Sequence, residues 1–189
     1  MDSTDDKVEM LSSISSPTSG NILDIQWDKW MLREMIFTPD KMKWLWETMQ
    51  GYKTLFSDLT RGKLENFVDV VLLPDSFWVE VVEKETEQII GIMYVTDLRL
   101  VIDASVHLVF FDRKPVEKSM ICRFAIEWMF KNFPLQRLTA YVPSIYWMTI
   151  KLAKNIGFVE EGRRRQALLI GNRWVDQMIF GILRREVIG

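Results

Sequence analysis

Two side chains whose chemistry operates near neutral pH, His107 and Cys122, each occur once in the chain. His107 lies in the alternating run 104–111, and its unperturbed pKa suits a proton acceptor; the alternative is a half-exposed strand residue with a satisfied hydrogen bond. Cys122 lies inside a predicted helix, several residues from its N-terminus, so we expect a small structural residue. One histidine and one cysteine cannot form a Cys/His zinc cage, and no metal site is predicted.

Composition and charge limit the class of protein. The chain has 189 residues, of which 48% are hydrophobic, so it can bury a core and is not a disordered protein. Its net charge of −2 and the isolated basic run 163–165 argue against a nucleic-acid partner. No apolar run reaches the roughly 20 residues that cross a membrane, and the acidic residues 1–6 lack the features of a secretory signal. We expect a cytoplasmic protein with a polar tail (1–20) and a single domain (21–189).

Hydrophobic periodicity divides the domain into helices and strands. Helical spacing of apolar residues predicts helices, and runs rich in β-branched and aromatic residues predict strands. The expected elements are a helix from Thr38 to Gly51, strands over 77–83, 89–96 and 104–111, a helix over 120–129, a strand over 137–142, a helix opened by Ser144 and stopped by Gly157, and a hairpin of 164–170 with 173–183 around Gly171-Asn172. The strand–helix–strand order in the second half requires one parallel pair of strands.

Three segments of the second half carry a family resemblance: RLTAYV (137–142), KLAKNIGFVEEG (151–162) and GNRWVDQMIFGILRREV (171–187). In order and spacing they resemble the GNAT acetyltransferases, and among these the ribosomal-protein N-terminal acetyltransferases. By element order the resemblance extends over 22–187. It implies an α/β (α+β) fold with a central mixed, mostly antiparallel sheet of six to seven strands, flanked by helices, and a V-shaped splay between strands four and five.

The resemblance implies that acetyl-CoA binds as a co-substrate at the turn after the fourth strand. In the family this turn contains glycines, which let the backbone approach the pyrophosphate. Here the turn has no glycine, and Pro115 removes one N–H donor. We expect Arg113, Lys114, Lys118 and Ser119 to bind the cofactor, because cationic side chains can replace backbone donors to phosphate. The alternative is that the turn has lost coenzyme A binding.

The resemblance also implies cofactor contacts nearer the acetyl group. Because the fourth and fifth strands separate, the backbone groups of Leu108, Val109 and Phe110 are expected to bind the pantetheine amide and the thioester oxygen. Thr149 lies where a serine is usual in the family, and we expect it in the cofactor site.

Proton transfer requires an acid and a base. Tyr146, or Ser144 in a second alignment, falls where the family often has an asparagine. The Tyr146 hydroxyl can protonate the departing thiolate, and packing on the helix surface is the alternative. His107 can accept the proton of the incoming ammonium directly or through water, with Glu80 and Glu83 as alternative bases; the structural alternative for these carboxylates is a solvent-facing charge.

Two classes of function follow. The first is an N-acetyltransferase that moves acetyl from acetyl-CoA to a primary amine, either a protein N-terminus or a small amine. The second is a GNAT-fold protein that has lost cofactor binding and acts as an interaction or structural subunit. A group of N-terminal aromatic residues suggests a substrate pocket, a homodimer contact or a surface for a protein partner, with additional core as the alternative. These residues are Trp27, Trp30, Trp44 and Trp46.

Overall fold

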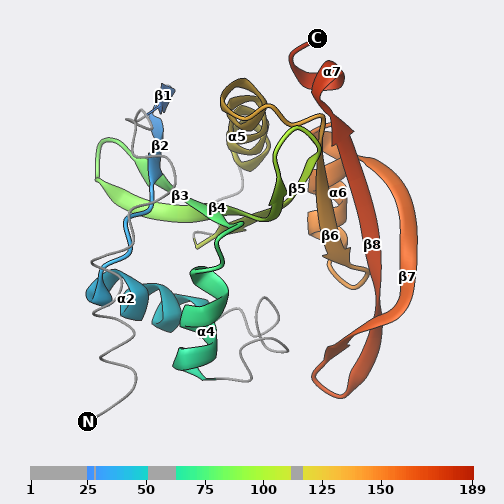
Figure 1. Ribbon diagram of the computed structural model, residues 1–189, viewed down its shortest axis with the longest axis horizontal. Helices are drawn as coiled ribbons and strands as arrows, with labels where there is room; N and C mark the ends of the chain where they lie inside the picture. The colour runs from blue at the N-terminus through green and yellow to red at the C-terminus, as the bar shows by residue number, and fades with distance from the viewer. Residues whose placement is uncertain (1–24, 28, 51–62, 112–116) are drawn as a thin grey trace.

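The computed structural model describes residues 25–27, 29–50, 63–111 and 117–189 (Figure 1). Several expectations lie outside these ranges and are not described: the tail over 1–20, the helix stop at Gly51, the side chain of Trp27, and the turn residues Arg113, Lys114 and Pro115.

A single sheet runs through the described part of the molecule. Its strands are β1 (Ile25–Trp27), β2 (Trp30–Glu34), β3 (Phe77–Glu83), β4 (Gln88–Arg99), β5 (Asp103–Phe110), β6 (Arg137–Pro143), β7 (Val159–Ile170) and β8 (Arg173–Leu183). The helices are α2 (Pro39–Gln50), α4 (Leu64–Val71), α5 (Lys118–Asn132), α6 (Trp147–Asn155) and α7 (Arg184–Val187).

The sheet is mixed and mostly antiparallel, as predicted. Its spatial order is β1-β2-β3-β4-β5-β6-β8-β7, and the one parallel pair among the described strands is β5 with β6. The described strands number eight, beside the six to seven expected, because the three-residue β1 extends the edge at β2.

Strands β5 and β6 are joined only near their N-terminal ends. Residues 103–105 pair with residues 137–139, and the ladder ends there. Beyond this point β5 continues to Phe110 and β6 to Pro143, and Figure 1 shows the two strands diverging. The predicted splay between strands four and five is therefore the opening between β5 and β6.

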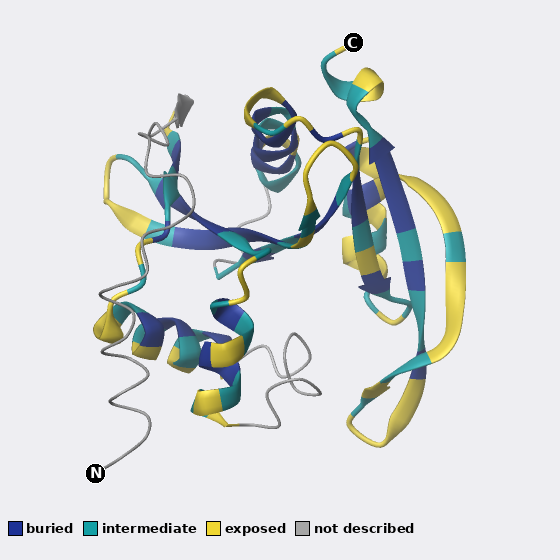
Figure 2. Ribbon diagram, in the orientation of Figure 1, coloured by how far each residue is buried: buried dark blue, intermediate teal, exposed yellow. Residues whose placement is uncertain are grey.

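Helices cover both faces of the sheet. One core cluster fills the space between the sheet and helices α5 and α6, and a second lies between the sheet and helices α2 and α4 (Figures 1 and 2). β5 contributes to both, because its side chains alternate as the sequence predicts: Ala104 and Val106 join the first cluster and Val109 the second. Both faces of β5 are thus fixed by packing.

The N-terminal aromatic residues pack on these cores. Trp44 and Phe111 meet edge to face with ring centroids 5.8 Å apart, and Trp46 lies 5.2 Å from Phe67. Trp30 is half-buried against the other cluster. These three tryptophans are therefore part of the core packing, which was the alternative to an interaction surface. The exposed tryptophans of the described residues are Trp147 and Trp174.

Local signals at the ends of elements are largely confirmed. The Thr38 hydroxyl accepts a hydrogen bond from the Lys41 N–H at 3.2 Å, which caps α2. Gly157 ends α6 with a φ of 108°, and Gly171 turns the β7–β8 hairpin with a φ of 59°. Among the described helices, none is long and apolar enough to span a membrane.

The helix expected from Ser144 begins later, at Trp147. The Ser144 N–H donates to the Asp176 carbonyl at 2.8 Å, and the Tyr146 N–H donates to the Pro143 carbonyl at 2.9 Å. These bonds form a turn that ties the chain to β8 before helical bonding starts. The predicted start at Ser144 was wrong, because the Ser144 N–H bonds to the carbonyl of Asp176, which lies 32 residues further along the chain.

Candidate active site

One edge of β5 faces the splay beyond Ser105, the last residue that pairs with β6. The Phe111 N–H donates to the Ile90 carbonyl at 2.8 Å, so the backbone at this position faces β4. Because backbone groups alternate between the two sides of a strand, those of Val109 also face β4, whereas those of Leu108 and Phe110 face the β6 side. Two of the three expected backbone groups thus lie on the open edge, and Val109 points away from it.

Helix α5 begins beside the C-terminal end of β5. Its first residue, Lys118, places its Nζ 5.4 Å from the centroid of the Phe110 ring. Ser119 follows in the first turn, where backbone N–H groups have no partner within the helix. Lys29 pairs with the carboxylate of Glu117 at 2.9 Å and offsets its negative charge. The described part of this turn therefore offers a cation and a helix N-terminus to an anion.

Tyr146 and Thr149 belong to the β6 side of the splay. Tyr146 directly precedes α6, and its half-buried ring packs against the core cluster beneath that helix. Thr149 is exposed in the first turn of α6. The candidate acid therefore lies where β6 ends, on the opposite side of the splay from Leu108 and Phe110.

His107 belongs to a stack of three rings that crosses β3, β4 and β5. Trp78 and Tyr94 stack with centroids 4.1 Å apart, and Tyr94 and His107 stack with centroids 4.4 Å apart. The His107 Nε2 lies 3.3 Å from the Thr96 Oγ1. Burial lowers the pKa of His107 to about 4, with the negative charge of Asp97 opposing the shift. The imidazole is therefore neutral at pH 7 and a weaker base than free histidine.

Glu80 is buried beneath α2 and is not a solvent-facing charge. Its Oε2 accepts a hydrogen bond from the Arg33 Nε at 2.9 Å, and its Oε1 accepts one from the Lys41 Nζ at 2.6 Å. Both oxygens are engaged by cations, so the residue joins β3 to β2 and α2. Glu83 accepts a hydrogen bond from the Thr86 hydroxyl at 2.7 Å beside the hairpin turn. Two ion pairs at one buried carboxylate fit a structural role.

A depression of about 380 Å³ lies where β4, β5 and β6 meet, and no sequence motif marked it. It is lined by Asp97, Arg99, Asp103, Ser105 and Tyr141. The Asp97 carboxylate accepts a hydrogen bond from the Ser105 hydroxyl at 3.1 Å, and Asp97 itself has a φ of 52°. These residues come together only when three strands pair, so their spacing in the sequence carries no signal.

Cys122 is a residue of α5 and is fully buried in the core between that helix and the sheet, as expected for a structural residue. Burial raises the pKa of its thiol to about 12, with the charge of Lys118 opposing the shift. The thiol is therefore protonated at neutral pH and is not a nucleophile.

Comparison with known families agrees with this geometry. The family model for the acetyltransferase (GNAT) domain matches residues 43–179. The chain therefore belongs to the GNAT acetyltransferase family, as its sequence resemblance implied. No match was found among curated protein sequences.

Solved acetyltransferases share the fold at low identity. The ribosomal-protein-S5-alanine acetyltransferase from Vibrio fischeri has a TM-score of 0.66 and 16% identity, over 87% of this chain and 98% of that one. A GNAT-family acetyltransferase from Bacillus anthracis has a TM-score of 0.63 and 19% identity, over 87% and 100%. The dodecameric spermidine N-acetyltransferase from Vibrio cholerae has a TM-score of 0.66 and 15% identity, over 82% and 94%. Likenesses at these identities are likenesses of fold.

Proposed function

We propose that the protein transfers an acetyl group from acetyl-CoA to a primary amine, either a protein N-terminus or a small amine, in the cytoplasm. The observation that carries the proposal is the splay: β5 and β6 separate after three paired residues, and the backbone of Leu108 lies beyond them on the β6 side of β5. An open backbone edge in a folded protein is costly unless it is solvated or binds a ligand. Lys118 lies at the same end of β5.

The described residues fit acetyl-CoA in part. The C=O group of Leu108 and the backbone of Phe110 would bind the pantetheine amides, and Lys118 with the N–H of Ser119 would bind the diphosphate. Thr149, exposed on the first turn of α6, would contact the cofactor from the other side of the splay. When bound, acetyl-CoA supplies an activated thioester carbonyl.

Each chemical step is assigned to a group of this chain. The Leu108 N–H donates a hydrogen bond to the acetyl oxygen as negative charge develops there. His107, neutral at pH 7, accepts the amine proton transiently through Nε2 or through water, beside the Thr96 hydroxyl. The Tyr146 hydroxyl protonates the departing thiolate. Glu80 is assigned no catalytic step, because its two oxygens bind Arg33 and Lys41 and hold α2 on the sheet.

A second function is favoured by one observation. The turn after β5 has no glycine and contains Pro115, unlike the pyrophosphate turn of the family. A GNAT-fold subunit that no longer binds coenzyme A and acts through a partner would have such a turn.

A thermal-shift measurement separates the two functions. Acetyl-CoA at about 100 times its Kd adds about 2.7 kcal/mol of stability, and for a domain of this size each kcal/mol raises the Tm by about 2–4 °C. We expect a rise of several degrees in wild type and in the control Lys43→Glu, and little or no rise in Lys118→Glu. No rise in wild type at millimolar acetyl-CoA would support the interaction subunit. Tyr146→Phe should keep the shift and lower kcat.

A further inference from the structure

The β7–β8 hairpin concentrates positive charge in an acidic protein. Between Gly162 and Val175 the sequence has four arginines and no acidic residue, whereas the whole chain has a net charge of −2. Strand β7 forms one edge of the sheet, and Figure 1 shows the hairpin extending beyond the end of β6. The tip is largely exposed in Figure 2. The hairpin therefore presents its charge to solvent, away from the packed layers.

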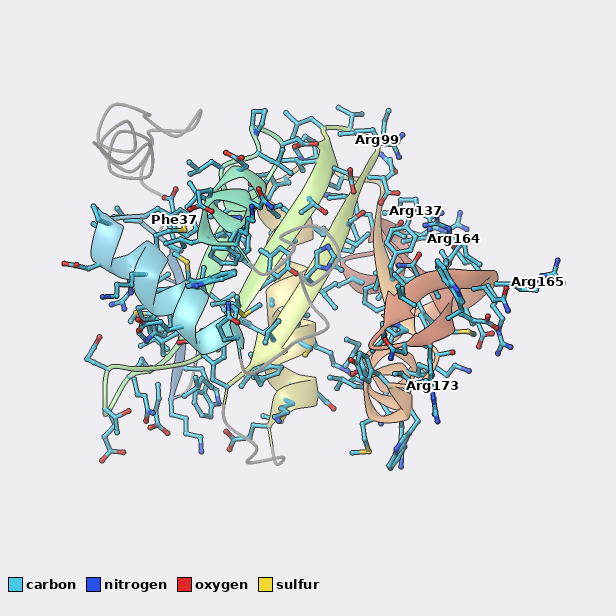
Figure 3. The ribbon with its side chains drawn as sticks, turned by 90° about the horizontal axis from the view of Figure 1, so that it is seen from below. Phe37, Arg99, Arg137, Arg164, Arg165 and Arg173 are labelled. Atoms are coloured by element: carbon cyan, nitrogen blue, oxygen red, sulfur yellow. The ribbon has the colours of Figure 1, made fainter. Side chains whose placement is uncertain are left out.

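The arginines differ in what they contact. The Arg163 Nη1 pairs with the Asp176 carboxylate at 3.5 Å, and the Arg164 Nη1 donates to the Gln177 Oε1 at 2.9 Å. Arg165 and Arg173 are exposed and make no ion pair or hydrogen bond with the described residues. Figure 3 shows Arg165 extending outward from the hairpin. These two guanidinium groups are available to a ligand.

A bulge in β7 gives this charge a defined shape. The strand register shifts between Arg164 and Leu168, so three residues of β7 lie opposite Asp176 alone. Gln166 adopts a φ of 50°, and its N–H donates to the Asp176 Oδ1 at 2.8 Å. A depression of about 660 Å³ opens here, lined by Arg165, Gln166 and Asp176. Since the Asp176 carboxylate is occupied by Gln166 and Arg163, the unpaired charge at the depression is that of Arg165.

Exposed apolar side chains lie on the same hairpin and at the start of α6. Trp174 is 63% exposed and pairs across the hairpin with Leu169, which is 48% exposed. Trp147, at the start of α6, is 66% exposed. A hairpin that carries an exposed indole and two unpaired guanidinium groups suits a ligand that has both carboxylates and aliphatic or aromatic groups.

One hydrogen bond between backbone groups connects the depression to the candidate active site. The Asp176 carbonyl accepts a hydrogen bond from the Ser144 N–H at 2.8 Å, and Tyr146 follows two residues later. Asp176, which lines the depression, is thus bonded to the turn that precedes the candidate acid. An acceptor peptide whose N-terminal amine reacts near Tyr146 would reach the hairpin within a few residues of that amine.

We propose that the β7–β8 hairpin binds an acidic peptide segment through Arg165, Arg173 and Trp174, and that this segment follows the amine that is acetylated. The inference rests on the proposed function and narrows its acceptor to protein N-termini followed by acidic residues. A peptide fits better than a nucleic acid, because the two unpaired arginines stand in a chain of net negative charge without a longer basic stripe.

Fluorescence anisotropy tests the docking without turnover. Two peptides share an N-terminal residue and a C-terminal label and carry either glutamates or lysines from the third position on. The glutamate peptide should bind wild type and weaken with added salt, and the lysine peptide should not bind. Arg165→Glu/Arg173→Glu should weaken binding about tenfold, because two attractive contacts become repulsive. Trp174→Ala should also weaken it.

Arg185→Glu provides the matched control, since it makes the same charge change on exposed α7, at the far end of β8 from the hairpin tip. It should leave binding unchanged. Equal binding of both peptides, or unchanged binding by the double hairpin variant, would overturn the proposal. Displacement of the glutamate peptide by a lower concentration of single-stranded RNA would overturn it in favour of a nucleic-acid site.

Acetyl transfer to the same peptides distinguishes this inference from the proposed function. We expect a higher kcat/KM for the glutamate peptide, and the double hairpin variant should lose this preference through a raised KM with kcat retained. Transfer at equal kcat/KM to both peptides would sink the acceptor assignment and leave the acetyltransferase intact. No transfer to any amine, with no thermal shift by acetyl-CoA, would instead remove the proposed function, while the anisotropy result still decides whether the hairpin binds acidic peptides.

Discussion

The two ends of the β5–β6 pair are built in opposite ways. At the closed end, the Thr139 hydroxyl donates to the Asp103 carboxylate at 2.8 Å, and Arg137 lies 3.6 Å from the same carboxylate. At the open end, the β5–β6 ladder has ended at Ser105, and the backbone of Leu108 lies beyond it on the side that faces β6. The difference shows that the position of the two strands is fixed at their paired end. Polar side chains join β5 to β6 there, so the strands can diverge beyond it and leave room for a ligand between them.

The closed end is a chain of alternating charges across four strands. Arg99 on β4 and Arg137 on β6 both approach Asp103 on β5, and Arg137 also pairs with Glu161 on β7. The hydrogen bond that Arg137 donates to the Glu161 carboxylate is the main reason that the pKa of Arg137 is raised.

The largest expected effect comes from breaking the closed end. Asp103→Ala removes the acceptor of the Thr139 hydroxyl and leaves Arg137 with one carboxylate fewer, at a cost of about 3–4 kcal/mol. Urea unfolding measures the loss. Asp103→Asn, which keeps an acceptor for the hydroxyl, should lose less, and Glu47→Ala on exposed α2 should change stability by less than about 0.5 kcal/mol. A loss in Asp103→Ala no larger than in the Glu47 control would show that the charges do not hold this end.

A pH titration probes the position between the two ends, where His107 lies two residues beyond the last paired residue, Ser105. The folded pKa of about 4 is below the ordinary 6.5, so between these values the unfolded chain binds a proton that the folded chain does not. Stability is therefore complete above about pH 6.5 and falls as the pH decreases toward 4, by about 3 kcal/mol.

The chain has one histidine, so the assignment is direct. Urea unfolding at a series of pH values should show the fall in wild type. His107→Phe, which keeps an aromatic ring beside Tyr94, should flatten it between pH 6.5 and 5, above the range where carboxylates begin to titrate. An identical pH dependence in the variant would contradict a buried neutral imidazole.

The smallest effect on stability is expected at the open end. A Cβ added at Gly91 would lie 2.5 Å from the Val109 carbonyl oxygen and 3.3 Å from the Phe110 Cα, so Gly91→Ala must displace the last residues of β5. We expect a loss of about 2 kcal/mol, together with a disproportionate loss of the thermal shift by acetyl-CoA. Gly162→Ala, which has open space around it, is the control. If Gly91→Ala kept the full shift, the backbone edge would not be the cofactor contact.

The sequence predicted well those features that depend on local order. Alternation along 104–111 assigned the faces of β5, and Gly171-Asn172 identified the hairpin turn. The splay came from resemblance, since no local pattern encodes the separation of two strands. Helix α4 was not predicted, although its residues 64–71 have apolar positions at helical spacing.

Features that depend on distant partners could not be predicted. Glu80 is neutralised by Arg33, 47 residues away, and Thr139 bonds Asp103, 36 residues away. Each was an isolated polar residue in the sequence. The side of β5 toward which the Val109 backbone points could not be predicted either. It depends on whether the odd-numbered residues of β5 form their hydrogen bonds with β4 or with β6.

The buried thiol of Cys122 on α5 also allows local opening of the native protein to be measured without introducing a new labelling site. A thiol-specific reagent can modify Cys122 only while α5 is lifted from the sheet, because the side chain is fully buried and its pKa is raised to about 12. As the chain has one cysteine, the labelling rate reports a single opening event. Ligands that clamp the helix onto the sheet will slow that reaction in proportion to how much they suppress the opening.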